Sequence, residues 1–375
     1  MKIVIIASLA ESLINFREAF LSALIQAGYE VIAYAPGKNP FVEEQLKKKG
    51  IVYQSIPLQN TSQNPLKDFF SLGYLIWLLR KQKADVVFGY TIKPVIYGSI
   101  AARVAGVSNI FSMITGLGYS FIGKGLKHHI LQFVVSFLYR LALKNNKSVF
   151  FQNPDDLNLF VERRLVRREQ AVLISGSGID LNRFTESSIF NKPPVFLLIA
   201  RLLKDIGIFE YIEAARIIKA NYPQAIFQLL GPFDSNPSAI SKKQMMKWKQ
   251  EGVVDYLGET QDVRSFIKKS NIYVLPSYRE GTPRSVLEAM AMGRPVITTD
   301  APGCRETVIE GRNGFLIPIK DIEALVKAME YFILHSESIP QMGKCSREIA
   351  EEKYDVNNVN AMILTAMKTC LLYTS

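Results

Sequence analysis

Short apolar runs alternate along the first half of the chain with segments whose apolar residues recur at helical spacing. The runs predict strands at residues 2–7, 31–35, 52–56, 86–88, 110–113 and 149–152. The periodic segments predict helices at residues 16–26, 41–49, 66–81, 97–104, 126–143 and 155–165. Buried strands that alternate with helices are typical of a parallel sheet covered on both faces, so we expect an α/β fold.

The same alternation restarts after Asn191-Lys192-Pro193-Pro194, which the pattern predicts as a linker. Further strands are expected at residues 195–199, 225–230, 254–257, 272–275, 296–298 and 314–317. Further helices are expected at residues 208–221, 263–269, 285–292 and 322–334. We therefore predict two doubly wound, Rossmann-like domains, residues 1–190 and 191–350, that face a central cleft at the carboxyl ends of their strands. Residues 351–369 are expected to form a helix that returns toward the first domain.

The two ends of the sequence need separate consideration. The first apolar run follows Lys2 and resembles a signal peptide, but Glu11 interrupts it and no cleavage site follows, so a buried strand is preferred. Residues 370–375 look foreign, because a common sequencing adaptor encodes them in one reading frame. We expect a scar that replaces the natural C-terminus, with a frayed natural tail as the alternative. No run of about 18 apolar residues occurs, so no spanning helix is expected.

Charge is distributed unevenly along the 375 residues. Up to Glu186 there are 22 Lys/Arg and 13 Asp/Glu, a balance of +9, and the remainder carries +2 of the total +11. In residues 66–83 and 124–147 the basic side chains lie among aromatic ones, a composition that favours an anionic membrane surface. The alternative is a pair of ordinary amphipathic helices with a solvated basic edge. No nucleic-acid motif is present. The three cysteines have no metal-ligand spacing, which suits a reducing cytoplasm.

A strand–loop–helix segment, residues 275–296, carries the most specific chemistry. The chain turns through Gly281 and Pro283 and opens a helix near Ser285, and the N–H groups of a helix start bind a diphosphate. Glu280 can accept hydrogen bonds from sugar hydroxyls, and Glu288, one helical turn below the opening, suits the paired hydroxyls of a ribose. The candidate donor-binding residues are Gly281, Thr282, Pro283, Arg284, Ser285 and Glu288. The alternative is a solvated Glu280 and a capping Glu288.

A second loop, residues 198–208, also ends a strand and enters a helix. Together the two loops resemble the retaining glycosyltransferases of the GT-B fold, family-4 type. The likeness rests on Glu280-x7-Glu288 with its Glu-Gly-x-Pro and Leu-Glu-Ala-Met-Ala-x-Gly-x-Pro-Val surroundings, and on residues 303–306, Gly-Cys-Arg-Glu.

The resemblance implies a cationic pair in the second loop. In the family an Arg and a Lys five residues later contact the donor diphosphate; Arg201 matches, but Ile206 stands at the Lys position. Arg201 and Glu280 are thereby implied as catalytic residues, and Lys204 is the candidate that replaces the missing cation. A surface role for Arg201 and a sequencing error at position 206 are the alternatives.

The first half supplies candidates for the acceptor. Residues 90–94 and 114–119 follow apolar strands and resemble the subset of the family that extends lipid-diphosphate-linked sugars for bacterial polysaccharides. The expected acceptor-binding residues are Thr91, Lys93, Thr115, Gly116 and Gly118. The glycines permit close backbone approach, and Lys93 can pair with a phosphate. The alternatives are a tight turn and a solvated lysine. Asn15-Phe16-Arg17 also matches this subset, whereas Ser8-Leu9-Ala10-Glu11 replaces the family's glycine pair.

These observations predict a glycosyltransferase that moves a hexose or N-acetylhexosamine from a nucleotide sugar, expected to be UDP-linked, with retention onto a lipid-diphosphate-linked glycan. No Asp-x-Asp pair follows a strand at the cleft, so neither a metal nor a cofactor is expected. The expected location is the cytoplasm, peripheral on the inner face of the plasma membrane, with no nucleic acid as a partner. The alternatives are an impaired or non-catalytic nucleotide-sugar-binding homologue and a GT-B nucleotide-sugar epimerase. A Rossmann dehydrogenase is disfavoured, because no Gly-x-Gly-x-x-Gly follows the first strand.

Overall fold

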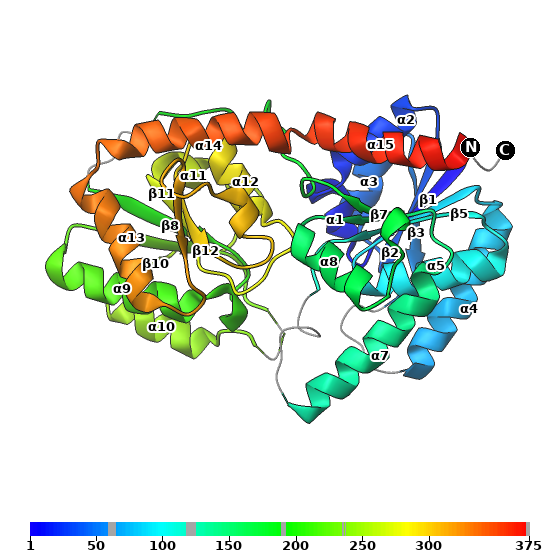
Figure 1. Cartoon of the computed structure of the whole chain (residues 1–375), viewed down its shortest axis with the longest axis horizontal. Coiled ribbons are helices and arrows are strands. Elements are labelled where there is room, and N and C mark those ends of the chain that lie inside the picture. Colours follow the sequence, from blue (N-terminus) through cyan, green and yellow to red (C-terminus); the bar gives the residue numbers. More distant parts are fainter. Residues whose placement is uncertain (59–64, 118–124, 189–192, 235, 237, 373–375) are drawn as a thin grey trace. The chain divides into compact units, whose positions relative to one another are not determined.

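The computed structural model describes the chain except residues 59–64, 118–124, 189–192, 235, 237 and 373–375. It divides into two compact units (Figure 1). The first is Met1–Ser177 together with Val356–Ser375, and the second is Gly178–Asp355. The sequence pattern places the divisions at 190/191 and 350/351. In the structure Ile179 and Phe184 are buried in the core of the second unit, so that unit begins before the Pro193-Pro194 stretch.

The first unit contains a parallel sheet in the order β3-β2-β1-β4-β5-β6-β7. Its strands are β1 (Lys2–Ile6), β2 (Glu30–Pro36), β3 (Val52–Ile56), β4 (Val86–Tyr90), β5 (Asn109–Ile114), β6 (Ser148–Phe151) and β7 (Ala171–Leu173). Its described helices are α1 (Ala10–Asn15), α2 (Glu18–Gln26), α3 (Pro40–Lys48), α4 (Pro65–Gln82), α5 (Ile92–Ala105), α7 (Leu126–Leu143), α8 (Pro154–Glu162) and α15 (Val356–Leu372). The first apolar run is therefore a strand, as predicted.

Both faces of this sheet are covered, because successive residues of each strand point to opposite sides. In β1, Ile3 and Ile5 join a core with α1, α2, α3 and α15, while Val4 and Ile6 join a core with α4 and α5. Helix α5 lies between α4 and α7 and contacts both of them. At the sequence level these strands read as continuous apolar runs, which is the pattern of a doubly covered parallel sheet.

The second unit repeats this architecture with the strand order β10-β9-β8-β11-β12-β13. Its strands are β8 (Val195–Ile199), β9 (Ile226–Leu230), β10 (Asp255–Tyr256), β11 (Ile272–Leu275), β12 (Val296–Thr299) and β13 (Gly314–Ile317). Its described α-helices are α9 (Ile208–Asn221), α10 (Lys242–Gln250), α11 (Arg264–Lys269), α12 (Arg284–Ala291), α13 (Ile322–Leu334) and α14 (Ser338–Tyr354). Short 3-10 turns occur at η2 (Lys204–Ile206) and η3 (Arg305–Thr307).

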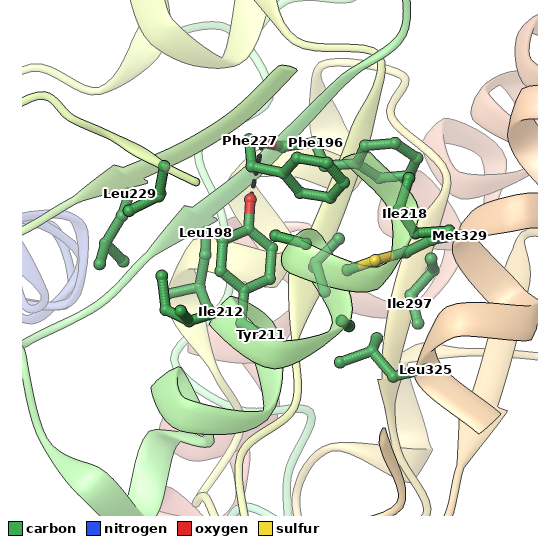
Figure 2. Packing of buried hydrophobic residues seen from close by; sticks show 14 of the residues in the cluster. Phe196, Leu198, Tyr211, Ile212, Ile218, Phe227, Leu229, Ile297, Leu325 and Met329 are labelled. Carbon is green, nitrogen blue, oxygen red and sulfur yellow. Dashed lines mark hydrogen bonds between the residues drawn. The ribbon is translucent and has the colours of Figure 1, made fainter. Parts of the chain in front are cut away.

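One face of the second sheet packs against α9 and α13 (Figure 2). The phenol of Tyr211 in α9 is fully buried there, and its hydroxyl donates a hydrogen bond of 2.8 Å to the carbonyl oxygen of Phe196 in β8. That bond satisfies a polar atom that would otherwise be costly in an apolar core. The opposite face is covered by residues of α11, α12 and α14.

Several elements differ from the sequence prediction. Helix α5 begins at Ile92 rather than at 97, so Pro94 lies in its first turn, where a missing N–H costs nothing. Helices α1, α10 and α14 and strand β7 were not predicted, and the helix expected at 351–369 is two helices that separate at Asp355. No helix among the described residues is long and apolar enough to cross a membrane.

Candidate active site

In each sheet the strand order reverses between the first and fourth strands, which are β1 and β4 in the first unit and β8 and β11 in the second. Ligands of open α/β sheets bind outside the carboxyl ends of the strands at this switch point. In the second unit, the loops that follow β8 and β11 are the two that carry the predicted donor residues. The topology therefore brings the two sequence motifs to one edge of one sheet.

Main-chain hydrogen bonds fix these loops against each other. The amide of Tyr278 donates to the carbonyl oxygen of Asp205 at 2.9 Å, which joins the loops after β11 and β8. The amide of Glu280 donates to the carbonyl oxygen of Pro302 at 2.9 Å, which joins the loop after β11 to the loop after β12. Gly303 has φ +82°, and a Cβ added there would overlap the carbonyl oxygens of Glu280 and Gly281. Only glycine fits this approach, so the Gly-Cys-Arg-Glu motif supports the Glu280 loop.

Glu280 is held by its own loop. The hydroxyl of Ser277 donates a hydrogen bond of 2.9 Å to Oε1 of Glu280. Burial raises the pKa of the Glu280 carboxyl above its usual value, and the Ser277 hydroxyl and the charge of Arg201 offset part of that rise. The Glu280 carboxyl is therefore partly buried and hydrogen-bonded, which disfavours the alternative of a solvated side chain. The two oxygens of this partly buried carboxylate offer several acceptor positions, so Glu280 can accept hydrogen bonds from more than one hydroxyl group.

Glu288 lies on α12, directly after this loop. Nε of Arg284 donates to Oε1 of Glu288 at 3.0 Å, and the two side chains are only 20% and 13% exposed. Burial raises the pKa of Glu288, while Arg284 and then Arg183 lower it. Pro283 precedes the helix and no side chain caps it, and Gly281 is buried beside it. The predicted donor-binding residues from Gly281 to Glu288 therefore form one continuous loop and first helical turns.

The loop after β8 presents Arg201 differently from the prediction. Nη1 of Arg201 lies 2.8 Å from Oδ2 of Asp234, in the loop after β9, although the Arg201 side chain is 64% exposed. Lys204 is exposed in η2, and its amide donates to the carbonyl oxygen of Ser238 at 2.9 Å. Ile206 is partly buried and packs against apolar residues of both core clusters of the unit.

The predicted acceptor residues lie at the carboxyl ends of β4 and β5 in the first unit. Thr91 has φ +70°, which is strained for a β-branched residue, and its Oγ1 is buried without a hydrogen-bond partner. Nζ of Lys93 lies 2.8 Å from Oδ1 of Asp68 in α4, so Lys93 is paired inside the protein rather than solvated. Thr115 and Gly116, with φ +117° at Gly116, follow β5. Gly118 lies outside the described residues.

Known proteins match both units of the chain. A family model described as "Glycosyl transferases group 1" matches residues 181–349, and one described as "Glycosyl transferase 4-like" matches residues 2–153. The N,N'-diacetylbacillosaminyl-diphospho-undecaprenol alpha-1,3-N-acetylgalactosaminyltransferase of Campylobacter jejuni is 30% identical over 343 residues, which cover 87% of each protein. This chain belongs to the group 1 glycosyltransferases.

Other relatives agree with this assignment. The UDP-Gal:alpha-D-GlcNAc-diphosphoundecaprenol alpha-1,3-galactosyltransferase of Escherichia coli is 27% identical over 278 residues and covers 70% of each protein. Sucrose-phosphate synthase from Thermosynechococcus elongatus has a TM-score of 0.82 at 18% identity, with both chains covered fully. The fold of this glycosyltransferase is therefore GT-B with two Rossmann-like domains, as the sequence predicted.

Sequence reasoning missed several polar residues of the glycosyltransferase at the two switch points. In the first unit the hydroxyls of Ser12 and Tyr90 lie 2.7 Å apart, and the buried Arg17 guanidinium lies 5.0 Å from the centroid of the Tyr90 ring. The match at Asn15-Phe16-Arg17 was the available signal for Arg17. In the second unit the hydroxyl of Tyr278 donates a hydrogen bond of 2.6 Å to Oε1 of Glu210 in α9, a contact that the sequence does not reveal.

No group of three or more His, Cys, Asp or Glu side chains that could hold a metal ion occurs among the described residues. The charged residues that we predicted for the donor loops and α12 are Arg201, Lys204, Glu280, Arg284 and Glu288. These side chains can bind sugar hydroxyls and phosphate oxygens directly.

Proposed function

We propose that this glycosyltransferase moves a hexose or N-acetylhexosamine, with retention of configuration, from a UDP-sugar onto a sugar carried by a lipid diphosphate. The bond between the anomeric carbon and the diphosphate oxygen breaks, and its electron pair leaves with the nucleoside diphosphate. An acceptor hydroxyl oxygen bonds to that carbon and releases its proton. The observation that carries the proposal is the pair of partly buried carboxylates, Glu280 and Glu288, on the two sides of the α12 N-terminus at the switch point.

On the donor side each group has a distinct proposed role. Glu288 binds the ribose hydroxyls, the first turn of α12 binds the diphosphate, and Glu280 binds hydroxyls of the transferred sugar. Arg201 stabilises the charge that develops on the leaving diphosphate, an effect worth about 10²–10³ in rate at comparable sites. Arg201 must exchange Asp234 for the phosphate to do so, and its exposed side chain permits that movement. Lys204 is the second proposed cation.

The acceptor is proposed from the relatives and from the first unit. The names of the Campylobacter jejuni and Escherichia coli relatives both specify sugars linked to undecaprenyl diphosphate, and the latter names UDP-Gal as donor. At the β1/β4 switch point of this chain, Thr91 immediately precedes α5 and its hydroxyl has no hydrogen-bond partner. Lys93 lies in the first turn of α5. We assign these residues, with Thr115 and Gly116, to the acceptor diphosphate. In this proposal, side chains and main-chain groups bind the donor and the acceptor diphosphate without a metal ion.

A lipid-linked acceptor implies work at a membrane surface. Helices α4 and α7 expose large aromatic side chains, at Phe69, Phe70, Trp77, Phe133 and Phe137. Residues 86–154 contain seven Lys/Arg and no Asp or Glu, a balance that favours anionic lipid. We therefore infer peripheral attachment to the inner face of the plasma membrane, where cytoplasmic nucleotide sugars are available.

Two measurements test the donor and the reaction. UDP and GDP sugars are screened for protection against thermal unfolding, since a ligand at 100 times its Kd adds about 2.7 kcal/mol of stability. Release of the nucleotide is then measured with and without a lipid-diphosphate sugar acceptor. We expect UDP-specific protection, lost in Glu288→Ala but kept in Glu323→Ala, which removes an exposed carboxylate from the first turn of α13. Unchanged protection in folded Glu288→Ala contradicts the donor assignment.

A second candidate function is a nucleotide-sugar-binding homologue without transferase activity. The apolar Ile206 at the position of the family's second cation favours it. UDP-sugar protection without acceptor-dependent UDP release would support this second function over the first.

A further inference from the structure

A groove with a volume of about 460 Å³ lies in the first unit where β2 and β3 end beside α4. Its lining includes Pro36 from β2, Ser55, Ile56 and Pro57 at the end of β3, and Phe70 and Tyr74 from α4. Most of these side chains are apolar, and the volume lies within the range of about 300–1,000 Å³ that small-molecule sites occupy. Such a lining suits a hydrocarbon rather than a sugar or a nucleotide.

The groove opens at the same edge of the sheet as the proposed acceptor site. All strands of this sheet are parallel, so the carboxyl ends of β2 and β3 lie on the edge where β4 delivers Thr91. In the order β3-β2-β1-β4, neighbouring strands are about 4.8 Å apart, which places the groove roughly 12 Å from the end of β4. A long lipid chain attached to a diphosphate at β4 can span that distance.

A short polar link joins the two places. Asp68 lies on α4 within one turn of Phe70, and it binds both Nζ of Lys93 at 2.8 Å and the hydroxyl of Tyr97 at 2.9 Å. The α4 turn that lines the groove is thereby held next to the α5 turn that carries the proposed phosphate-binding lysine. Lys93, which must exchange Asp68 for a phosphate oxygen, and the apolar groove are arranged in the order of a polar head and an apolar tail.

The aromatic surface continues from the groove along α4. Phe70 is 67% exposed although it lines the groove, and the rings of Tyr74 and Trp77 lie 5.6 Å apart between centroids. A peptide strand fits this place poorly, because Pro36 and Pro57 have no N–H groups to donate. The basic residues of 86–154, which include Lys93, are complementary to the diphosphate group of such a lipid.

We propose that this groove binds the hydrocarbon chain of the lipid-diphosphate acceptor, with the diphosphate at Thr91 and Lys93. The proposal rests on the proposed function, because that function supplies the lipid. It adds a chain-binding subsite formed by β2, β3 and α4. The site then selects acceptors by the length of their lipid as well as by their sugar.

Binding of two soluble probes that share a diphosphate but differ in chain length tests this subsite. Farnesyl diphosphate has three isoprene units and dimethylallyl diphosphate has one, and both are titrated by calorimetry into the full chain without vesicles. We expect the parent to bind farnesyl diphosphate at least tenfold more tightly, because burial of each methylene is favourable. In Phe70→Ser and in Ser55→Trp, which fills the groove, we expect the two affinities to differ less than threefold.

The matched control is Phe41→Ser, which removes a phenylalanine of similar exposure, 65%, from α3 outside the groove lining. It should keep the parental ratio. The proposal is overturned if the parent binds the two diphosphates equally well. It is also overturned if the ratio of the two affinities is unchanged in both groove variants, or if Phe41→Ser lowers that ratio as much as they do. Failure of the proposed function is seen separately, as absence of transfer to lipid acceptors of any chain length.

Discussion

Ile206 lies in the loop that carries Arg201 and Lys204, at the position where the resemblance implies a second cation. Its side chain packs against residues of both core clusters of the second unit, which explains how an apolar residue is accommodated there. A lysine at this position can keep its methylene stem on the same surface and extend its ammonium group to solvent or ligand. The substitution is therefore compatible with the fold.

We expect Ile206→Lys to raise kcat by up to 10²–10³, because a second cation acts mainly on the charge of the leaving diphosphate. Steady-state kinetics separate this from an effect on KM alone, which would indicate uniform binding. Ile206→Leu is the control and should leave kcat unchanged. If Ile206→Lys has no effect while Lys204→Ala abolishes turnover, Lys204 is the second cation. If neither Ile206→Lys nor Lys204→Ala changes kcat and the parent is active, this loop does not bind the donor diphosphate.

The partly buried carboxyl of Glu280 should make the stability of the protein depend on pH. Its pKa is raised in the folded state chiefly by burial, so the folded state holds the proton more tightly than the unfolded state. Stability is then fully present below the unfolded pKa of about 4.3 and decreases as pH rises through the folded value. We expect Glu280→Gln to melt at a higher temperature than the parent at pH 7. The difference should vanish near pH 4, and a difference that persists there contradicts the assignment to ionisation.

Among the elements, α12 is fixed at its carboxyl end by a buried arginine. Nε and both terminal nitrogens of Arg294 donate to main-chain carbonyls of Ile267, Lys268, Met292, Gly293 and Ser187 and to the Ser187 hydroxyl, at 2.8–3.3 Å. Burial lowers the pKa of Arg294 to about 10, with the nearby Glu186 opposing the shift. The guanidinium thus joins α11, α12 and the segment before β8.

We expect Arg294→Lys to destabilise the protein by about 2–4 kcal/mol, because an ammonium group has three donors and leaves buried carbonyls unsatisfied. Denaturant unfolding followed by circular dichroism measures the change. Arg312→Lys is the control, because Arg312 is half-exposed and its contact with Glu348 is 3.9 Å long. Equal stability of both variants would show that the Arg294 bonds contribute little.

Helices α4 and α7 expose the aromatic residues that we assign to membrane attachment. Replacing Phe133 and Phe137 of α7 by serine should weaken flotation with anionic vesicles at least tenfold, because each side chain loses apolar burial. High salt should weaken binding of the parent by screening the basic residues. Ile217→Ser on α9 serves as control. Equal recovery with neutral and anionic vesicles would exclude an electrostatic contribution.

Elements with a clear apolar run or helical spacing could be predicted from the sequence with their exact bounds, as β8, α9, β11, β13 and α13 show. Helix α10 was missed because it buries only Met245 and Trp248 in a lysine-rich segment, and α14 because Pro340 and Gly343 interrupt its pattern. The donor motif was placed on one loop and helix from its spacing. The pairs Arg201–Asp234 and Lys93–Asp68 could not be predicted, because their members are 33 and 25 positions apart. Loop paths bring the first pair together, and the packing of α4 against α5 brings the second pair together.

In the molecule as a whole, the first unit is discontinuous, since α15 joins it after the entire second unit. Val359, Ile363 and Met367 of α15 are buried in the core that also contains α2 residues, and α15 contacts β6. The helix lies beside α2 in Figure 1. The stability of the N-terminal half of the chain therefore depends on residues near its C-terminus.

We expect Ile363→Ala to destabilise the first unit by about 2–5 kcal/mol, because it leaves a cavity beneath the buried face of α15. Met362→Ala, at an exposed position of the same helix, should change stability by less than about 0.5 kcal/mol. Hydrogen exchange resolved by peptide measures both. Faster exchange confined to 178–355 in Ile363→Ala would contradict the assignment of α15 to the first unit.

The late position of α15 also affects how the protein is made. Between Ser177 and Leu372 the ribosome adds 195 residues, which at about 5–20 residues per second takes roughly 10–40 s. Throughout that interval the apolar side chains of the first unit that α15 later covers, including those of α2, remain open to solvent or chaperones. The second unit is one continuous stretch and can fold during this wait. A nascent chain that stalls before α15 therefore displays an uncovered N-terminal half, and quality-control factors can distinguish it from the finished protein.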